Sequence, residues 1–313
     1  MKKHLLGLAL AASLMSCAFA QTDNTANALR PAPKGQPPST QCNGNPCEIS
    51  YNGGPVFEDA PTVYILYYGS WSSTDMGIIN GYWSDLSGSK QEKINIRYGD
   101  SSGKHVTGTL NFNPSTDTYQ DNYSLGKNMN DTLLQEAIAN AIKAGHLPSD
   151  SNGIYFGLTY KDVSWSGMCT SYCGYHGPTN SIVKGEIIKY SFVGDPGQCV
   201  NNCSFAFEYG SKAFPNEDPD ADGTINIMWH EFSESSSDPE VNLSTAWAGN
   251  ACGESGDCCA WLSGNIKTDT NGNYYNELIS GHEYLTQMML ELDKKQLGTV
   301  ISHCENVFEK KPH

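Results

Sequence analysis

The segment best suited to chemistry is a His-Glu-x-x-Glu motif formed by His230, Glu231 and Glu234. In an α-helix, residues four apart lie one turn above each other, so His230 and Glu234 would project an imidazole and a carboxylate from one face. These two groups supply half of a tetrahedral zinc site. Glu231 takes the position that His-Glu-x-x-His metalloproteases give to the general base acting on metal-bound water. The motif therefore predicts a metal-binding helix, with a Glu in place of the second His.

A third ligand is available in residues 253–259, which read Gly-Glu-Ser-Gly-Asp-Cys-Cys. Glu254 lies twenty residues after Glu234, a spacing similar to that of the third ligand in zincins that use a downstream Glu. Asp257 is a second candidate close by. Because a catalytic zinc takes three protein ligands and keeps one position open for water, the sequence predicts zinc held by His230, Glu234 and either Glu254 or Asp257.

His176 is a further candidate site residue, inside the block Cys-Gly-Tyr-His-Gly at 173–177. The glycines allow a close approach of the backbone and the cysteines could hold the loop, which would present the histidine to a substrate. The alternative is a histidine bonded to a backbone carbonyl in a cross-linked loop.

The metal-binding helix needs an apolar face that packs. Apolar residues at i, i+3, i+4 and i+7 lie opposite the predicted ligands, and Asp222 is placed to cap the start of the helix. This pattern predicts a helix that packs with one face and meets a ligand with the other. The four apolar residues are Ile225, Met228, Trp229 and Phe232.

The other elements alternate along the chain. Apolar and β-branched runs predict strands, and helical spacing of apolar residues predicts helices. We expect a single α+β (mixed α/β) domain, a central sheet with packed helices, and by analogy a zincin-like layout. The predicted strands are 62–68, 94–98, 105–112, 153–160 and 187–193, and the predicted helices are 78–86, 131–144 and 284–292.

Residues 1–20 have a basic start, a short apolar run and a small-x-small ending, which predicts a secretory signal peptide. Cys17 also ends a segment that resembles a bacterial lipobox, the alternative being a lipid-anchored or periplasmic form. Residues 21–41 are rich in proline and predict a flexible linker, so the domain should span 42–313. No apolar run approaches the ~20 residues of a transmembrane helix.

Cysteine content and charge limit the environment and the partners. Removing Cys17 from the 11 cysteines leaves an even number, which predicts disulfides in an exported chain. Short loops could close locally between Cys42 and Cys47, Cys169 and Cys173, or Cys199 and Cys203, while thiolate ligation of zinc is the alternative. A net charge of -15 opposes binding to nucleic acid.

Several blocks of the chain resemble the phosphate-induced protein 1 family, whose plant members include EXORDIUM. The blocks are Tyr-Asn-Gly-Gly-Pro-Val at 51–56, residues 63–71, Cys-Thr-Ser-Tyr-Cys-Gly-Tyr-His-Gly at 169–177, and Asn-Gly-Asn-Tyr-Tyr-Asn at 271–276. The resemblance implies a secreted protein associated with growth-related cell-wall responses, and it implies no defined activity.

Two functions from different classes follow. The first is a secreted zinc-dependent hydrolase, peptidase-like, in which Glu231 is the general base and an extracellular peptide is the substrate. The second is a non-catalytic extracellular module that binds a cell-wall component or a receptor in growth or host interaction, with a metal motif that is structural.

Overall fold

The computed structural model describes residues 28–29, 49–249, 253–292 and 302–305. The predicted signal peptide and most of the predicted linker lie outside the described residues. Among the described residues, no helix combines the length and the hydropathy needed to cross a bilayer.

The centre of the fold is a six-stranded sheet in the order β1-β8-β9-β6-β3-β4, in which β1 is a two-residue edge strand. Four of these strands run parallel, and β8 pairs antiparallel with β9. The short strand β1 (Ala28–Leu29), within the predicted linker, pairs antiparallel with β8. The parallel strands are β3 (Thr62–Tyr68), β4 (Thr118–Asp121), β6 (Gly153–Thr159) and β9 (Ile188–Gly194), and β8 spans Gly174–Thr179.

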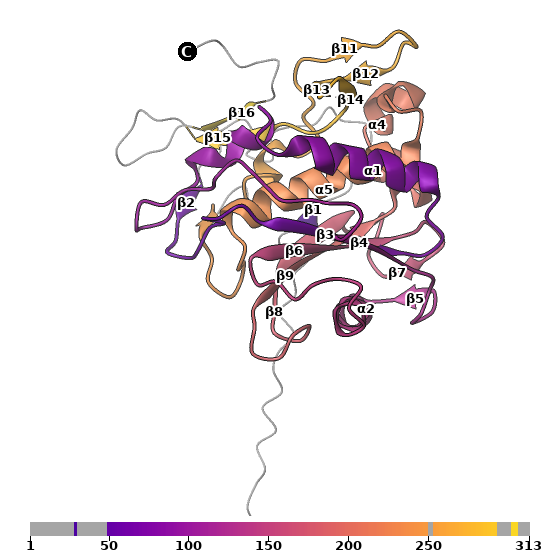
Figure 1. Ribbon diagram of the computed structural model, residues 1–313. Coiled ribbons are helices and arrows are strands. Elements are labelled where there is room, and N and C mark those ends of the chain that lie inside the picture. The colour runs from indigo at the N-terminus through magenta and orange to yellow at the C-terminus, as the bar shows by residue number, and fades with distance from the viewer. Residues whose placement is uncertain (1–27, 30–48, 250–252, 293–301, 306–313) are drawn as a thin grey trace, which may run out of the picture.

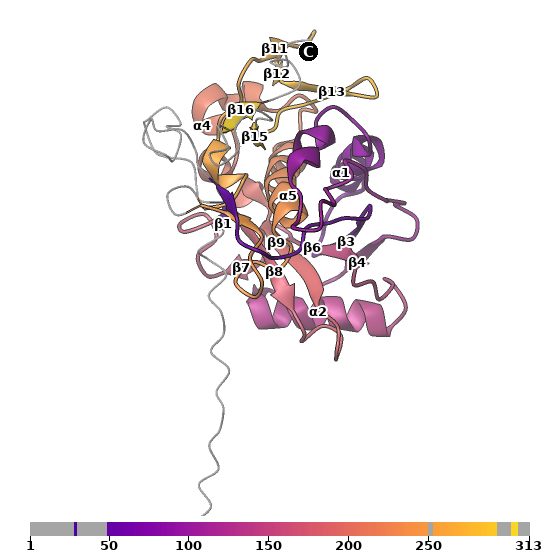
Figure 2. The ribbon, with the colours of Figure 1, turned by 90° about the vertical axis from the view of Figure 1, so that its left-hand side faces the viewer.

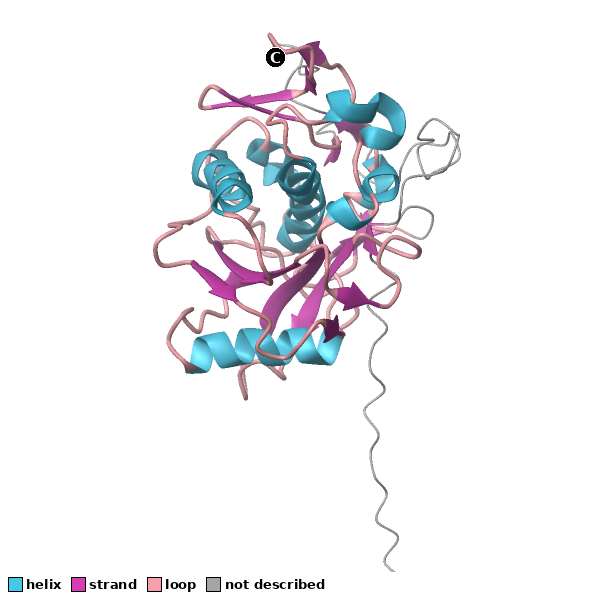
Figure 3. Ribbon diagram, turned by 90° about the vertical axis from the view of Figure 1, so that its right-hand side faces the viewer, coloured by secondary structure: helices cyan, strands magenta, loops and turns pink. Residues whose placement is uncertain are grey.

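Helices cover both faces of the sheet and make three layers (Figure 1). The helices α1 (Ser73–Leu86) and α5 (Pro219–Ser237) lie on one face, and α2 (Asp131–Lys143) lies on the other, as Figure 3 also shows. Neighbouring residues of β6 contact the two layers. The ring of Phe156 packs against Trp83 of α1, and Gly157 leaves room for a leucine of α2. The mixed α/β single domain is therefore confirmed.

The helix α5 is buried along almost its whole length, between α1, the sheet and the C-terminal hairpins (Figure 2). Every residue from Ala221 to Ser237 is buried, polar ones included. The predicted packed face is present, and the face that carries the predicted ligands is buried as well. The helix begins earlier than predicted, because Pro219 suits its first turn and the Asp218 carboxylate accepts the backbone N–H groups of Asp220 and Ala221. Asp222 lies inside the helix and is not its cap.

Five long elements agree with the sequence-based prediction, namely β3, α1, α2, β6 and β9, although α1 begins five residues before the predicted helix 78–86. Two predicted strands are wrong. Residues 94–98 fall largely in the 3₁₀ helix η2 (Glu92–Arg97), and residues 105–112 form only isolated bridges, broken at Gly108 with φ 66°. The predicted helix 284–292 is also wrong, because the chain there passes from β14 (His282–Tyr284) to β15 (Met289–Leu292).

The remaining elements are short. The strands are β2 (Ser50–Tyr51), β5 (Asn128–Met129), β7 (Ser164–Trp165), β10 (Trp247–Ala248), β11 (Lys267–Thr268), β12 (Tyr274–Tyr275), β13 (Glu277–Ile279) and β16 (Ser302–Glu305), and the helices are η3 (Pro196–Gln198), α3 (Val200–Cys203), α4 (Ala206–Tyr209), η4 (Gly210–Ala213) and η5 (Asp257–Cys259).

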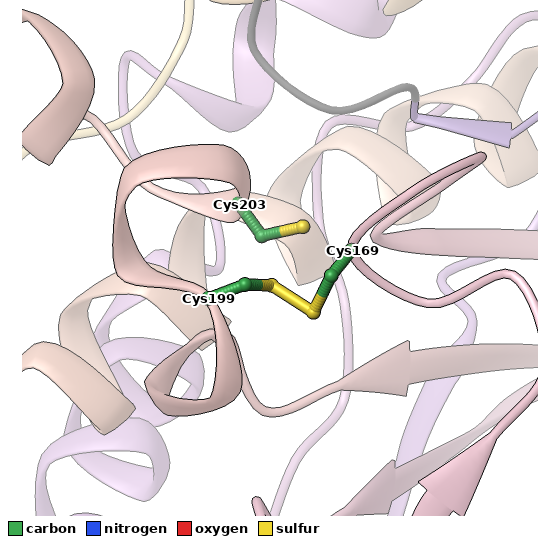
Figure 4. Close-up of side chains that lie close together, drawn as sticks. All are labelled: Cys169, Cys199 and Cys203. Carbon is green, nitrogen blue, oxygen red and sulfur yellow. A yellow bond between two sulfur atoms is a disulfide. The ribbon is translucent and has the colours of Figure 1, made fainter.

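Within the described residues, three disulfides join segments that are distant in the sequence. The bridges are Cys169–Cys199, Cys173–Cys203 and Cys259–Cys304. The two Cys-x3-Cys segments therefore cross-link with each other and do not close their own loops. Cys169, Cys199 and Cys203 gather at one place, and Figure 4 shows the sulfur atoms of Cys169 and Cys199 joined. Disulfide bonding explains this group without a thiolate-bound metal. Cys42 and Cys47 lie outside the described residues.

Candidate metal centre

Six chemically active side chains meet between α5, β8 and the loop after β10. The helix α5 contributes His230, Glu231 and Glu234, which one turn of helix places close together. The strand β8 contributes His176, and the loop contributes Glu254 and Asp257. Each of the six exposes at most 6% of its surface. All the site residues predicted from the sequence therefore lie in one buried cluster.

His230, Glu234 and Asp257 form the first group with metal-ligand spacing. The His230 Nε2 atom is 3.1 Å from Glu234 Oε1 and 3.9 Å from Asp257 Oδ1. The Asp257 backbone N–H also donates to Glu234 Oε1, at 3.0 Å. Of the two predicted third ligands, the structure brings Asp257 to this group, and Glu254 lies instead beside His176.

Gln287 fixes the orientation of the His230 ring. Its Nε2 donates to the carbonyl oxygen of Gly256 at 2.9 Å, so its Oε1 is left as the atom that faces His230 Nδ1, at 3.1 Å. Since Oε1 can only accept, Nδ1 carries a hydrogen, and Nε2 is the nitrogen that faces the carboxylates, where it can hold a proton or bind a cation. Metal-binding histidines are held in this way by an acceptor behind the ring.

His176, Glu231 and Glu234 form a second group with metal-ligand spacing. The His176 Nδ1 atom is 3.2 Å from Glu231 Oε2 and 3.6 Å from Glu234 Oε2. On the other side of the ring, Nε2 is 3.4 Å from the carbonyl oxygen of Asp238 and 3.6 Å from Glu254 Oε1. His176 therefore lies in the same cluster as the His-Glu-x-x-Glu motif, which begins 54 residues later in the chain.

Several polar atoms of the cluster find no hydrogen-bond partner within the described part of the chain. They are His230 Nε2, Glu231 Oε1, Glu234 Oε2 and both carboxylate oxygens of Glu254. A buried polar atom without a partner costs roughly 1–3 kcal/mol, and a charged one costs more. These atoms converge from two segments, α5 and the loop after β10, which is the arrangement expected where a cation completes the site.

Burial and like charge raise the pKa values of three carboxyl groups in the cluster. Burial raises the pKa of Glu231 above its usual range, and burial together with the Glu234 charge raises the pKa values of Glu254 and Asp257 well above theirs. For His230, burial lowers the pKa, but Glu234 outweighs burial and brings it to about 10. The pKa of His176 is raised in the same way, because the effect of Glu231 outweighs that of burial, which lowers the pKa. Without a cation, the cluster therefore holds protons.

Two glycines allow the backbone to approach the cluster closely. A Cβ atom at Gly256 would lie 2.9 Å from both Glu234 Oε1 and His230 Nδ1. One at Gly174 would lie 2.6 Å from a methyl group of Ile227 and 3.1 Å from Glu231 Oε1. Any side chain at these positions would push the loop or β8 away from α5.

Sequence reasoning missed Gln287 and Asp238. Gln287 lies in a segment whose apolar spacing predicts a helix, and its role depends on a backbone path that this pattern does not reveal. The helix α5 holds that path, because Asn226 Oδ1 accepts the Gln287 N–H at 2.7 Å and Trp229 Nε1 donates to the Gln287 carbonyl at 3.2 Å. Asp238 faces His176 with its backbone carbonyl, and its buried carboxylate also contributes to raising the pKa of His176. It belongs to none of the motifs found in the sequence.

One further group with metal-ligand spacing lies at the C-terminal hairpin, formed by Glu291, His303 and Glu305. Arg97 already pairs with Glu291 at 3.1 Å, and His303 is exposed. The Arg97 guanidinium therefore already balances the charge of Glu291. The buried cluster on α5 is the stronger candidate for a metal site.

Comparisons with known proteins agree with the resemblance noted in the sequence. A family model described as the phosphate-induced protein 1 conserved region matches residues 49–300. Protein EXORDIUM-like 5 of Arabidopsis thaliana is 29% identical over 266 residues, which cover 77% of this chain and 71% of the relative. Protein EXORDIUM-like 3 of the same plant is 28% identical over 291 residues, 84% of each chain.

Protein PHOSPHATE-INDUCED 1 of Nicotiana tabacum is 25% identical over 197 residues, covering 56% of this chain and 60% of the relative. No solved structure matches the chain. The family model spans most of the chain and includes all six residues of the buried cluster, and the chain therefore belongs to the phosphate-induced protein 1 family.

Proposed function

We propose that this protein is a secreted metal-binding member of its family, and that His230, Glu234 and Asp257 bind a zinc ion. The observation that carries the proposal is the convergence of His230 Nε2 with two carboxylates in a buried site, where the Nε2 lone pair has no hydrogen-bond partner among the described residues. One imidazole and two carboxylates are a ligand set that zinc accepts. Gln287 completes the arrangement by holding the ring from behind.

Metal analysis of the purified mature protein tests this proposal. We expect at least about one equivalent of zinc, which is the content of a three-ligand site. His230→Ala should reduce the zinc content, and His282→Ala should not, because His282 is exposed on β14. A parent protein that takes up no zinc after dialysis against the metal would overturn the proposal.

Because the site is buried, the metal would stabilise the fold, and partners would bind elsewhere on the protein surface. The ligands expose almost no surface, and a peptide substrate would need to reach them. The protein then acts as an extracellular module whose partner is a cell-wall component or a peptide. Nucleic acid is a poor partner for a chain of net charge -15.

A peptidase-like hydrolase is the second candidate, and one observation favours it. Glu231 is next to the ligand His230 in the chain, and its Oε1 atom has no hydrogen-bond partner within the described residues. Bound zinc would supply a Lewis acid, and the free oxygen of Glu231 could take up a proton and pass it on to a leaving group. Cleavage of a broad peptide library by the parent, and its loss in Glu231→Gln, would support this function. The absence of any cleavage by zinc-loaded protein would exclude it for peptides.

A further inference from the structure

The two oxygens of the Glu234 carboxylate face different partners. Oε1 lies 3.1 Å from His230 Nε2 and accepts the Asp257 N–H, whereas Oε2 lies 3.6 Å from His176 Nδ1. Glu234 is also the one residue that the two buried groups with metal-ligand spacing share. A carboxylate that turns one oxygen to each of two ligand sets has the geometry of a bridge between two cations.

The two histidines are oriented by the same principle. His176 Nε2 faces the carbonyl oxygen of Asp238 at 3.4 Å, and a carbonyl can only accept, so this nitrogen carries the hydrogen. Its Nδ1 faces the carboxylates of Glu231 and Glu234, where it donates a hydrogen in the metal-free protein and can present its lone pair to a cation in place of that hydrogen. His230 repeats the pattern through Gln287. His230 Nε2 and His176 Nδ1 thus each face carboxylate oxygens. Such groups stay close together only when a proton or a cation lies between them.

The charge of the cluster points to more than one cation. Glu231, Glu234, Glu254 and Asp257 bring four carboxylates into a site from which water is nearly excluded. In the part of the chain that the structure describes, their ion pairs are with His176 and His230 only, and none is with lysine or arginine. One divalent ion balances two of these carboxylates and leaves the other two to hold protons, whereas two divalent ions can balance all four.

We propose that the centre is dinuclear, with two divalent cations bridged by Glu234. The first ion is bound by His230 and Asp257, and the second by His176 and Glu231. This inference rests on the proposed function, because the first ion is the zinc of that proposal. Two-metal sites hold their ions about 3.5–4 Å apart, a separation that one carboxylate spans.

The second ion gives Glu231 and Glu254 defined roles. Glu231 becomes a ligand through Oε2, the oxygen that lies 3.2 Å from His176 Nδ1. Glu254, 3.6 Å from His176 Nε2, is a positioning residue that supports the ring from behind, like the carboxylate in carboxylate-histidine-metal arrangements.

Titration of the metal-free full chain with zinc by calorimetry, followed by metal analysis, tests the dinuclear centre. We expect about two equivalents in the parent. His176→Gln and Glu231→Gln should each retain about one equivalent, because they leave the His230 group intact. Glu234→Gln should lose most of both. Glu136→Gln is the matched control, since Glu136 is exposed on α2 and should keep the parent stoichiometry.

A second measurement needs no variant. Loading the metal-free parent with Mn²⁺ should give an electron paramagnetic resonance spectrum of two magnetically coupled ions, as expected for a shared carboxylate. A parent that binds about one equivalent of metal, with the spectrum of an isolated ion, would overturn the dinuclear centre and leave the proposed zinc site standing. A parent that binds no metal would overturn both.

Discussion

At the scale of single residues, the cluster depends on how closely loop and strand approach α5. Gly256 lies against both His230 and Glu234, and its carbonyl oxygen accepts the amide of Gln287, which orients the His230 ring. The missing side chain at Gly256 is therefore as much a part of the site as the ligands.

Gly256→Ala should weaken zinc binding by about tenfold or more, because supporting groups of a metal site contribute at that level. The new Cβ would lie 2.9 Å from Glu234 Oε1, so the loop must move and take Asp257 with it. Competition with a chelator of known affinity measures the change.

Gly77→Ala is the matched control, because a Cβ there meets no atom within 4 Å and Gly77 lies in the helix α1. This variant should bind zinc as the parent does and gain up to about 1 kcal/mol of stability. Equal zinc affinity of Gly256→Ala and the parent would contradict the close approach described above.

At the scale of elements, α5 is a central helix whose polar side chains are buried in the core together with its apolar ones. Its apolar side packs against α1, where the Trp83 ring lies 5.1 Å from Phe232 and 5.5 Å from Phe156 of β6. Trp83 Nε1 also lies 3.4 Å from the Met228 sulfur. This aromatic contact holds α5 at the depth that brings its other side to β8 and the loop.

Trp83→Ala should lower the free energy of unfolding by about 3–5 kcal/mol, because it removes a fully buried ring from a packed interface. Urea unfolding followed by circular dichroism measures the change. Leu278→Ala serves as the comparison, since Leu278 is 51% exposed and its removal should change stability by about 0.5 kcal/mol or less. Similar losses in the two variants would show that the α1–α5 interface is less tightly packed than described.

The paired disulfides act on the same scale, because they tie α3 to the loop that leads into β8, the strand of His176. Replacing Cys173 and Cys203 together with alanine should cost about 2–5 kcal/mol of stability. Replacing Cys169 and Cys199 should have an effect of the same kind, and both can be followed by thermal unfolding without reductant. Unchanged stability in both double variants would indicate that the bridges are dispensable for the fold.

At the scale of the whole molecule, the core contains acidic groups beyond the metal centre. Burial raises the pKa values of Glu92, Asp195 and Asp222 to about 7 each, against about 4 in an unfolded chain. The folded state therefore binds protons more tightly than the unfolded state does. The stability from these groups is fully present below about pH 4 and is lost as the pH rises through about 7.

The metal-free protein should accordingly be more stable at pH 5.5 than at pH 8, by about 2 kcal/mol for each such group. Urea unfolding at the two pH values measures the difference. Asp222→Asn replaces one of the three carboxyls with a neutral amide and should reduce the pH dependence by about one group's share. Stability that is flat or increases toward pH 8 would contradict the raised pKa values.

Much of the fold could be read from local pattern. The strands β3, β6 and β9 are continuous apolar runs, and α2 has a regular apolar stripe with Asn130 as its cap, so local preference and final environment agree. The motif at His230 to Glu234 and the downstream acids were also identified in this way, because helix geometry alone brings residues four apart together.

Other parts of the fold were decided by tertiary contacts. Residues 94–98 alternate like a strand, yet Asn95 turns inward with its Nδ2 3.3 Å from Ser233 Oγ, and the segment forms η2. Residues 284–292 have helical spacing, yet α5 binds the backbone of Gln287 and the chain stays extended into β15. Short patterns are weak, and a few long-range hydrogen bonds outweigh them.

The sequence by itself determined which residue types could bind a metal and that one helix would carry three of them. Only the tertiary structure decided that His176 joins the cluster, that Asp257 and not Glu254 faces His230, and that α5 is buried on all sides. The physical reason is that a helix sets the spacing of neighbours along the chain, whereas the meeting of α5, β8 and the loop depends on disulfides, glycine contacts and sheet order, which no local pattern encodes.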